Sequence, residues 1–291
     1  MAAPVFDFHL HVEPWFMLKP AVAPVMASGR SPEEVALLHR LQKEGAPAIL
    51  RYLDEEGITR ANIIAYAAPD VMGFTAAIHE WTADLLKGAE ERLHLWTSLH
   101  PHLVDDPVAE VDRLVDTLGA RGFKFHPLHQ GFPVNAHAEA PDSPAGKALA
   151  ATYRRCEERG IPIMIHTGTS IFPGARNKYG DPMHADDIAV DYPDLRIILA
   201  HAGRPLWCDA AMFLARAHRN VHLDLSSIPP KKLLEYLPDL PRLADKCLWG
   251  SDWPAPGVPS PGANARAFDA LPLPPEAKRK MLWENAVRLM G

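Results

Sequence analysis

The chain has 291 residues, of which 47 % are hydrophobic and 23 % are charged, a balance typical of a globular protein that buries a large core. The formal net charge is −6, with 30 basic and 36 acidic residues spread along the sequence, and this distribution argues against a nucleic-acid partner. No stretch reaches the roughly 20 apolar residues of a membrane span, and the first residues lack a signal-peptide pattern. Three widely spaced cysteines, Cys156, Cys208 and Cys247, fit a reducing compartment, so we expect a cytoplasmic protein that acts on a small molecule.

Eight short apolar runs follow one another along the chain, each with the length of a buried strand. They are Val5–His11, Asn62–Tyr66, Leu93–Leu99, Gly122–His126, Pro162–His166, Arg196–His201, Val221–Leu225 and Lys246–Ser251. The segments between them carry helical patterns. These are a helix beginning after Ser31, then Val108–Leu118, Ala145–Arg159, Cys208–Arg219 and a final helix over Glu276–Leu289.

This alternation of strands and helices predicts a parallel sheet. Eight repeats in a chain of this length favour one (β/α)₈ TIM-barrel domain over residues 1–291. An open dinucleotide-binding sheet is disfavoured because its glycine pattern does not follow the first strand. Two long loops, roughly 12–30 and 167–187, follow strand ends, where barrel enzymes build their active sites.

Polar side chains stand at the carboxyl ends of most of these strands, and in a barrel these ends meet on one face. They are His9, His11, His100, Lys124, His126, His166, His201 and Asp252. His9 and His11 are two residues apart on a strand, so both imidazoles can face the barrel axis and share a cation. With His166 and Asp252 they make a nitrogen and oxygen donor set suited to Zn²⁺. We expect Asp7 to lie beneath this site and to orient it.

The motifs around these residues resemble those of the amidohydrolase superfamily, in its amidohydrolase-related branch of enzymes similar to aminocarboxymuconate-semialdehyde decarboxylase. The matching segments are Asp7–His11, Gly122–Pro127, Ile165–Gly168, Leu199–Gly203 and Gly250–Pro254. The resemblance implies that His9, His11, His166 and Asp252 hold one metal ion, usually zinc, and that His201 acts as the catalytic histidine. It also implies that the protein can form a homodimer.

Lys124 is open to more than one interpretation. Superfamily members with two metals use a carboxylated lysine at the end of the fourth strand as a bridge, which would make Lys124, His166 and His201 a second metal site. The alternatives are a lysine paired with a nearby carboxylate and a lysine that contacts an anionic substrate. We favour one metal ion.

These residues are compatible with two reactions. The first expectation is hydrolysis of an amide, ester or lactone by a metal-activated water, with Asp252 accepting the proton and His201 delivering it to the leaving group. The alternative is non-oxidative decarboxylation of a small unsaturated or aromatic acid. That reaction needs a cation for the substrate carboxylate, and Arg204 is the first candidate, before Arg176 and Lys178; a salt bridge within the protein is the competing role for Arg204.

Other side chains near the strand ends are weaker candidates for substrate contact. Trp253 and His126 come first, and Trp15, Phe74, Trp207, His102 and His129 follow. Two further classes remain as alternatives, a metal-free lactonase-type hydrolase and a binding protein on an inactive barrel. The complete set of His9, His11, His166, His201 and Asp252 argues against the inactive barrel.

Overall fold

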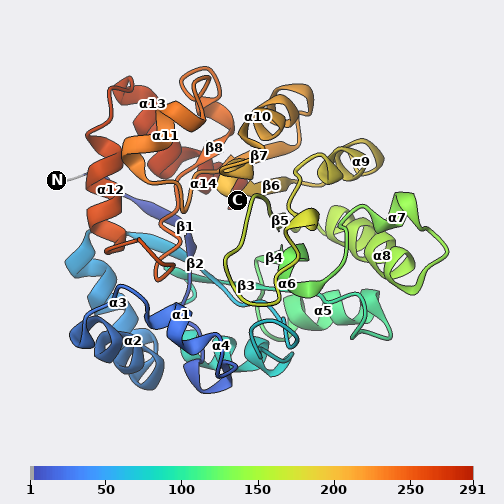
Figure 1. The fold of residues 1–291 in the computed structure, drawn as a ribbon, viewed down its shortest axis with the longest axis horizontal. Coiled ribbons are helices and arrows are strands. Elements are labelled where there is room, and N and C mark those ends of the chain that lie inside the picture. Colours follow the sequence, from blue (N-terminus) through green and yellow to red (C-terminus); the bar gives the residue numbers. More distant parts are fainter. Residues whose placement is uncertain (1–2, 291) are drawn as a thin grey trace.

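The computed structural model describes residues 3–290 and contains an eight-stranded parallel sheet in the order β1 to β8 (Figure 1). The strands are β1 Phe6–Leu10, β2 Arg60–Ile64, β3 Leu93–Thr97, β4 Gly122–Phe125, β5 Ile163–His166, β6 Ile197–Ala200, β7 Val221–Asp224 and β8 Cys247–Leu248. Each strand pairs in parallel with the next one in the chain, as in Lys124 opposite Met164 and Ile198 opposite His222, and the β1–β2 pairing has one register shift between Asp7 and Leu10. The predicted (β/α)₈ barrel is therefore confirmed.

The helices surround the barrel as an outer layer (Figure 1). They are α1 Ala23–Ala27, α2 Pro32–Glu44, α3 Ala46–Glu56, α4 Ala77–Leu86, α5 Pro107–Asp116, α6 Pro127–Gln130, α7 Ala136–Glu139, α8 Pro144–Glu158, α9 His184–Asp191, α10 Cys208–Ala217, α11 Pro230–Tyr236, α12 Pro261–Asp269, α13 Pro275–Arg279 and α14 Asn285–Met290. A π-helical turn, Lys280–Glu284, joins α13 to α14, so the predicted final helix forms with this one irregularity. None of the described helices is long and apolar enough to cross a membrane.

The barrel closes through residues that follow β8. The Phe8 amide donates to the Trp249 carbonyl at 3.1 Å, the Asp252 amide to the His9 carbonyl at 2.7 Å, and the His11 amide to the Trp253 carbonyl at 2.8 Å. Strand eight was expected to extend to Ser251, but its ladder with β7 ends at Leu248. The chain beyond that point hydrogen-bonds to β1 instead, and this brings Asp252 beside the two histidines of β1.

The core has two parts because successive strand residues point to opposite faces. Phe123, Ile165 and Leu199 belong to the larger cluster, which fills the space between the strands and the helices. Trp96, Met164 and Ile198 belong to the smaller cluster and alternate with them, on the same side as Lys124. Trp96, Met164 and Ile198 are completely buried and give the barrel an apolar interior beside Lys124.

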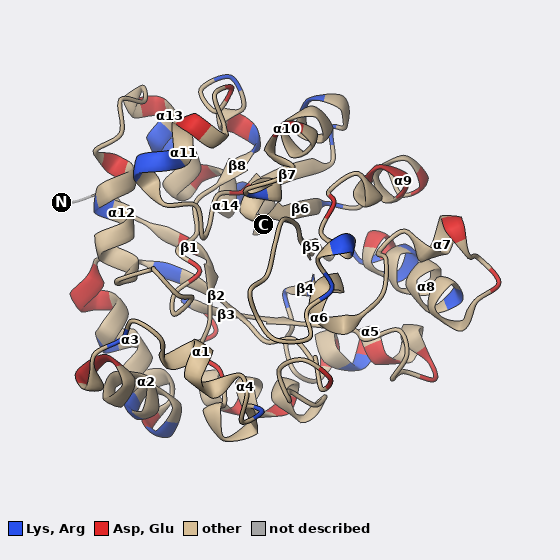
Figure 2. Cartoon of the chain, in the orientation of Figure 1, with Lys and Arg blue, Asp and Glu red and all other residues tan. Residues whose placement is uncertain are grey.

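The surface agrees with the expectations from composition. Basic and acidic residues are interspersed along the outer helices, and no basic stripe is visible in this view (Figure 2). Cys156, Cys208 and Cys247 are buried and are not disulfide-bonded to one another. The long loops are not irregular throughout: residues 12–30 include α1 and a 3₁₀ turn at Trp15–Met17, and residues 167–187 include a 3₁₀ turn at Asn177–Tyr179 and the start of α9.

Candidate metal centre and substrate pocket

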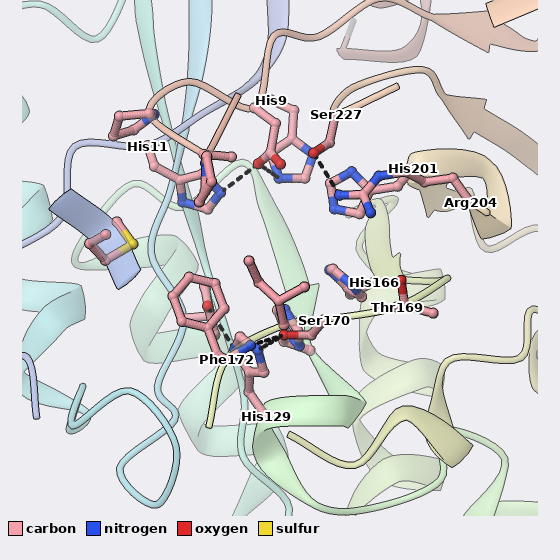
Figure 3. A pocket seen from close by; sticks show the side chains of 18 of the residues that line it. His9, His11, His129, His166, Thr169, Ser170, Phe172, His201, Arg204 and Ser227 are labelled. Carbon is pink, nitrogen blue, oxygen red and sulfur yellow. Dashed lines mark hydrogen bonds and ion pairs between the residues drawn. The ribbon is translucent and has the colours of Figure 1, made fainter. Parts of the chain in front are cut away.

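A cavity of about 420 Å³ opens at the carboxyl ends of the strands (Figure 3). Nine of the residues singled out in the sequence line it, namely His9, His11, Lys124, His126, His129, His166, His201, Arg204 and Asp252. They come from strands β1, β4 and β5 and from the segments that follow β1, β4, β6 and β8. The barrel thus brings together side chains that are up to 243 positions apart in the chain, from His9 to Asp252.

Two of these residues lie on strained backbone. His201 and Asp252 have φ values of 64° and 61°, in the left-handed region that side chains other than glycine adopt at a cost. Both occupy the sharp turn that follows a strand, and this conformation directs their side chains into the cavity. Such strain persists only where the surroundings impose it, and it is concentrated at functional sites.

The side chains of His9, His201 and Asp252 converge, with one ligand atom of each within 4.8 Å of the others. His11 adjoins the same carboxylate, because its Nε2 lies 3.3 Å from Asp252 Oδ1 while His9 Nε2 lies 3.4 Å from that oxygen. The His9 and His11 rings are 5.2 Å apart, as expected for two same-side residues of one strand. The fold therefore brings together three of the four predicted ligands, His9, His11 and Asp252, and His201, the predicted catalytic histidine, lies in the same cluster.

Each of these imidazoles is held through its Nδ1 atom. His9 Nδ1 lies 2.5 Å from Asp224 Oδ2, His11 Nδ1 lies 3.1 Å from the Ile64 carbonyl, and His201 Nδ1 lies 3.2 Å from the Ser226 carbonyl. A carbonyl or carboxylate oxygen only accepts, so each Nδ1 carries a proton, and Nε2 keeps its lone pair wherever the ring is neutral. Second partners of this kind are typical of metal-bound histidines, because they set the ring orientation and the tautomer.

His166 enters the cavity at the end of a stack of imidazoles. Its ring is 3.8 Å from that of His126, which is in turn 3.5 Å from His129, with nearly parallel planes in both pairs. His166 Nε2 is buried and has no hydrogen-bond partner among the described residues. Its ring lies 4.6 Å from the His201 ring, at the edge of the converging cluster.

Burial keeps these histidines in the neutral form that binds metals. Together with nearby positive groups, it lowers the pKa of His9, His166 and His201 well below the usual value for histidine. A neutral imidazole with a free Nε2 is a metal ligand, whereas an imidazolium is not.

Lys124 lies at the floor of the cavity and is almost completely buried. Its Nζ is 3.5 Å from His9 Nε2 and 3.6 Å from Met164 Sδ, and within residues 3–290 it forms no ion pair with a carboxylate. The alternative of a lysine ion-paired with a nearby carboxylate is therefore not formed in the described chain. Burial lowers the pKa of the Lys124 ammonium, so the cost of its charge can be relieved by loss of the proton or by an anion in the cavity.

Asp7 lies beneath the site, as expected, but it holds backbone and not an imidazole. Its Oδ1 accepts from the Ser251 amide at 2.8 Å and from the His9 amide at 3.2 Å, and so ties β1 to the segment after β8. Asp224, which the sequence analysis missed, contacts the His9 ring instead. The signal was present as an ionisable residue inside the apolar strand Val221–Leu225.

Arg204 lines the cavity on the side of His201 and donates from Nη2 to Ser227 Oγ at 2.7 Å. Its Nε is buried without a hydrogen-bond partner, and the guanidinium forms no ion pair in the described part of the chain. The competing role of Arg204, an internal salt bridge, is therefore wrong. Arg176 and Lys178, the other candidate cations, do not line the cavity.

Trp253 does not line the cavity, which corrects its predicted role in substrate binding. It is buried with its ring 5.0 Å from that of Tyr52 on α3, because it follows Asp252 and points to the opposite side. The other expected wall residues outside the lining are Trp15, Phe74, Trp207, His100 and His102, whereas His129 lines it. The apolar wall is made instead by Met26, Tyr66, Met72, Phe172 and Tyr236, of which only Tyr66 stands at the end of a predicted strand.

The cluster fits a divalent metal ion. It offers imidazole nitrogens with lone pairs on His9, His11 and His201, the unpartnered buried Nε2 of His166, and the Asp252 carboxylate. Nitrogen and oxygen donors of this kind suit zinc and related ions.

A family model described as amidohydrolase matches residues 6–291. An uncharacterised TIM-barrel protein from Bordetella bronchiseptica is similar in structure, with 21 % identity, 99 % of this chain and 98 % of the other covered, and a TM-score of 0.71. A dihydroxybenzoic acid decarboxylase from Polaromonas sp. JS666, with bound manganese and the inhibitor 2-nitroresorcinol, has 16 % identity, 99 % and 97 % coverage and a TM-score of 0.67. The 5-carboxyvanillate decarboxylase of Sphingomonas paucimobilis has 16 % identity, 99 % coverage of both chains and a TM-score of 0.61. The comparison with curated proteins gave no match.

Proposed function

Because this chain belongs to the amidohydrolase family, we propose that it is a metal-dependent decarboxylase that releases CO₂ from a small aromatic or unsaturated carboxylic acid. Hydrolysis was the first expectation from the sequence. The decarboxylases of similar structure favour the alternative reaction instead, together with one feature of the pocket.

That feature is the unpaired Arg204 guanidinium in the wall of the cavity. A partly buried cation without a carboxylate partner is costly, and a carboxylate ligand relieves this cost through charge-assisted hydrogen bonds. A decarboxylase substrate carries that group by definition. Arg204 Nε is free to donate to it, while Ser227 holds Nη2 in place.

We assign the metal site to His9, His11, His166 and Asp252, with a single zinc ion as the proposed occupant. The manganese in the Polaromonas enzyme makes the identity of the ion part of the test. A divalent ion supplies positive charge that stabilises negative charge developing on the substrate.

The reaction breaks the bond between the substrate carbon and its carboxylate, and that carbon takes up one proton as CO₂ leaves. We assign delivery of the proton to His201. Its Nδ1–H is held by the Ser226 carbonyl, so Nε2 is the nitrogen that takes up a proton from water in the cavity and passes it to the carbon. Arg204 orients the carboxylate, and the apolar wall excludes water.

The test combines metal analysis with a CO₂ assay. Purified protein is analysed for metal, stripped with a chelator and reloaded with Zn²⁺ or Mn²⁺. It is then offered aromatic and dienoic carboxylates beside lactones, amides and esters. We expect one ion per chain and CO₂ release that depends on it. Turnover of a lactone, amide or ester without CO₂ would restore hydrolysis as the function, and full turnover by the stripped protein would favour the metal-free class.

Replacement of Arg204 tests the observation that carries the proposal. Arg204→Met keeps an apolar stem and removes the charge and the N–H donors, and we expect about a 10- to 100-fold loss in kcat/KM for the carboxylate substrate. Arg242→Met, at a site whose side chain is 87 % exposed, is the matched control. Equal activity of the two variants would contradict the role of Arg204.

A further inference from the structure

Glu13 is a buried acidic residue in the cavity wall to which neither the sequence motifs nor the proposed chemistry assigns a role. It is 5 % exposed and comes two residues after His11, where the chain leaves β1. Its Oε1 lies 3.4 Å from His11 Nδ1, and its Oε2 is buried without a hydrogen-bond partner in the described chain. An unpartnered carboxylate at the wall of a cavity needs a donor, and the protein supplies none to this oxygen.

The position of Glu13 argues against a role as a metal ligand. It adjoins the Nδ1 side of His11, whereas the opposite nitrogen, Nε2, faces Asp252 and the converging cluster. Glu13 is also not needed to orient the His11 ring. The Ile64 carbonyl accepts from Nδ1 at 3.1 Å, while the Glu13 oxygen is farther away and forms no hydrogen bond with it.

Glu13 and Arg204 flank the cluster from two sides. Glu13 adjoins His11 and Arg204 lies near His201, and Figure 3 shows His11 and Arg204 on either side of His9. The cavity therefore has a cationic wall at one end and an anionic wall at the other, with the candidate metal site between them.

We infer that Glu13 is a specificity-determining residue, which accepts a hydrogen bond from a hydroxyl or amino group that the substrate carries away from its carboxylate. The inference rests on the proposed function for the place of the carboxylate at Arg204. With that end fixed, Oε2 selects for a donor at the other end of the molecule. It disfavours a methyl group of similar size there, because the carboxylate would stay buried and unpaired.

Binding measurements test this independently of turnover. Benzoate and its ortho, meta and para hydroxy, amino and methyl derivatives are titrated calorimetrically into zinc-loaded protein. At one ring position, we expect the hydroxy or amino compound to bind about tenfold or more tightly than its methyl counterpart, as for a hydrogen bond to a charged group. The hydroxy and amino series show which donor is preferred.

Variants of Glu13 assign the effect. In Glu13→Leu we expect the donor preference to fall to near unity, and in Glu13→Gln we expect part of it to remain because the amide oxygen still accepts. Glu33→Leu, on the exposed face of α2, is the control. No donor preference in the natural protein at any ring position would overturn the inference. A donor preference that survives in Glu13→Leu would also overturn the inference. Loss of zinc from Glu13→Leu would overturn it as well.

The test of Glu13 and the test of the decarboxylase function can fail independently of each other. A Glu13-dependent donor preference without CO₂ release would retain Glu13 as a specificity residue and reject the decarboxylase. CO₂ release without that preference would retain the decarboxylase and reject the role of Glu13.

Discussion

Among single residues, the site depends on the groups that hydrogen-bond to the Nδ1 atoms of the imidazoles. Asp224 is the strongest of these, because its carboxylate lies 2.5 Å from His9 Nδ1 and also accepts from Ser226 Oγ at 2.7 Å. Asp224 and Ser226 are completely buried, so the His9 ring has little freedom to turn. A carboxylate behind a histidine also makes the opposite nitrogen a better donor to a metal ion.

We predict that Asp224→Asn lowers affinity for the metal about 10- to 100-fold, the usual cost of losing such a carboxylate. The neutral amide polarises His9 less and fixes its tautomer less firmly. Titration of stripped protein with Zn²⁺ against a competing chelator measures the change. Asp194→Asn, on an exposed carboxylate paired with Arg219, should leave metal affinity unaltered. If both variants bind zinc as the natural protein does, Asp224 has no part in the site.

At the scale of elements, the contact between β1 and the segment after β8 is the tightest part of the site. A Cβ atom added at Gly250 would lie 2.7 Å from His9 Cβ and 3.0 Å from Asp224 Oδ1, closer than side chains tolerate. Glycine at this position lets the two segments approach closely enough for the Asp252 amide to bond to the His9 carbonyl.

We predict that Gly250→Ala reduces metal affinity and destabilises the protein by roughly 1–3 kcal/mol, the usual cost of overpacking. The added methyl group must displace His9 or separate β1 from the chain after β8. Zinc titration and thermal denaturation report the two effects. Gly257→Ala is the comparison, because an added Cβ there meets nothing within 4 Å although φ is +86°. Gly257→Ala should destabilise the protein only because alanine is strained at this positive φ, and it should leave zinc binding intact. Equal zinc affinity in Gly250→Ala and Gly257→Ala would refute the steric argument.

At the scale of the whole molecule, buried histidines outside the site make stability depend on pH. Burial lowers the pKa of His79, His94 and His222 to about 4 each. His79 shows why protonation is disfavoured: its Nε2 lies 3.1 Å from Ser98 Oγ, but its Nδ1 is buried without a hydrogen-bond partner in the described chain. An imidazolium carries a proton on both ring nitrogens, so its charge and one N–H would be buried without an acceptor.

We predict that stability is lost as the pH falls from about 6.5, the value for an exposed histidine, toward 4. In that window the unfolded chain binds protons that the folded chain does not, so unfolding becomes easier. For His79 alone the loss at pH 5 is on the order of 2 kcal/mol. The free energy of unfolding, measured with urea, should differ less between pH 7 and pH 5 for His79→Gln than for the natural protein. His39→Gln, at an exposed position of α2, should show the same difference as the natural protein; identical pH dependence in all three would contradict the assignment to His79.

The sequence by itself determined the order of the elements and the residues with metal-binding chemistry. Apolar runs must be buried and helical segments must cover them, so the alternation specified a barrel, and the Ser31 capping box sets the start of α2 as expected. Strand ends converge in any such barrel, and this is why His9, His11, His166, His201 and Asp252 could be grouped before their positions were known.

Only the tertiary structure decided which neighbours each of these side chains has. Asp224 behind His9, Glu13 beside His11 and the unpaired Arg204 depend on distances between separate loops and strands, and no local pattern encodes those distances. The same holds for Trp253, whose side chain points into the outer core because the chain turns at Asp252. Periodicity assigns a residue to a face of its own element, whereas the side chains that meet across a cavity are set by the packing of all the elements together.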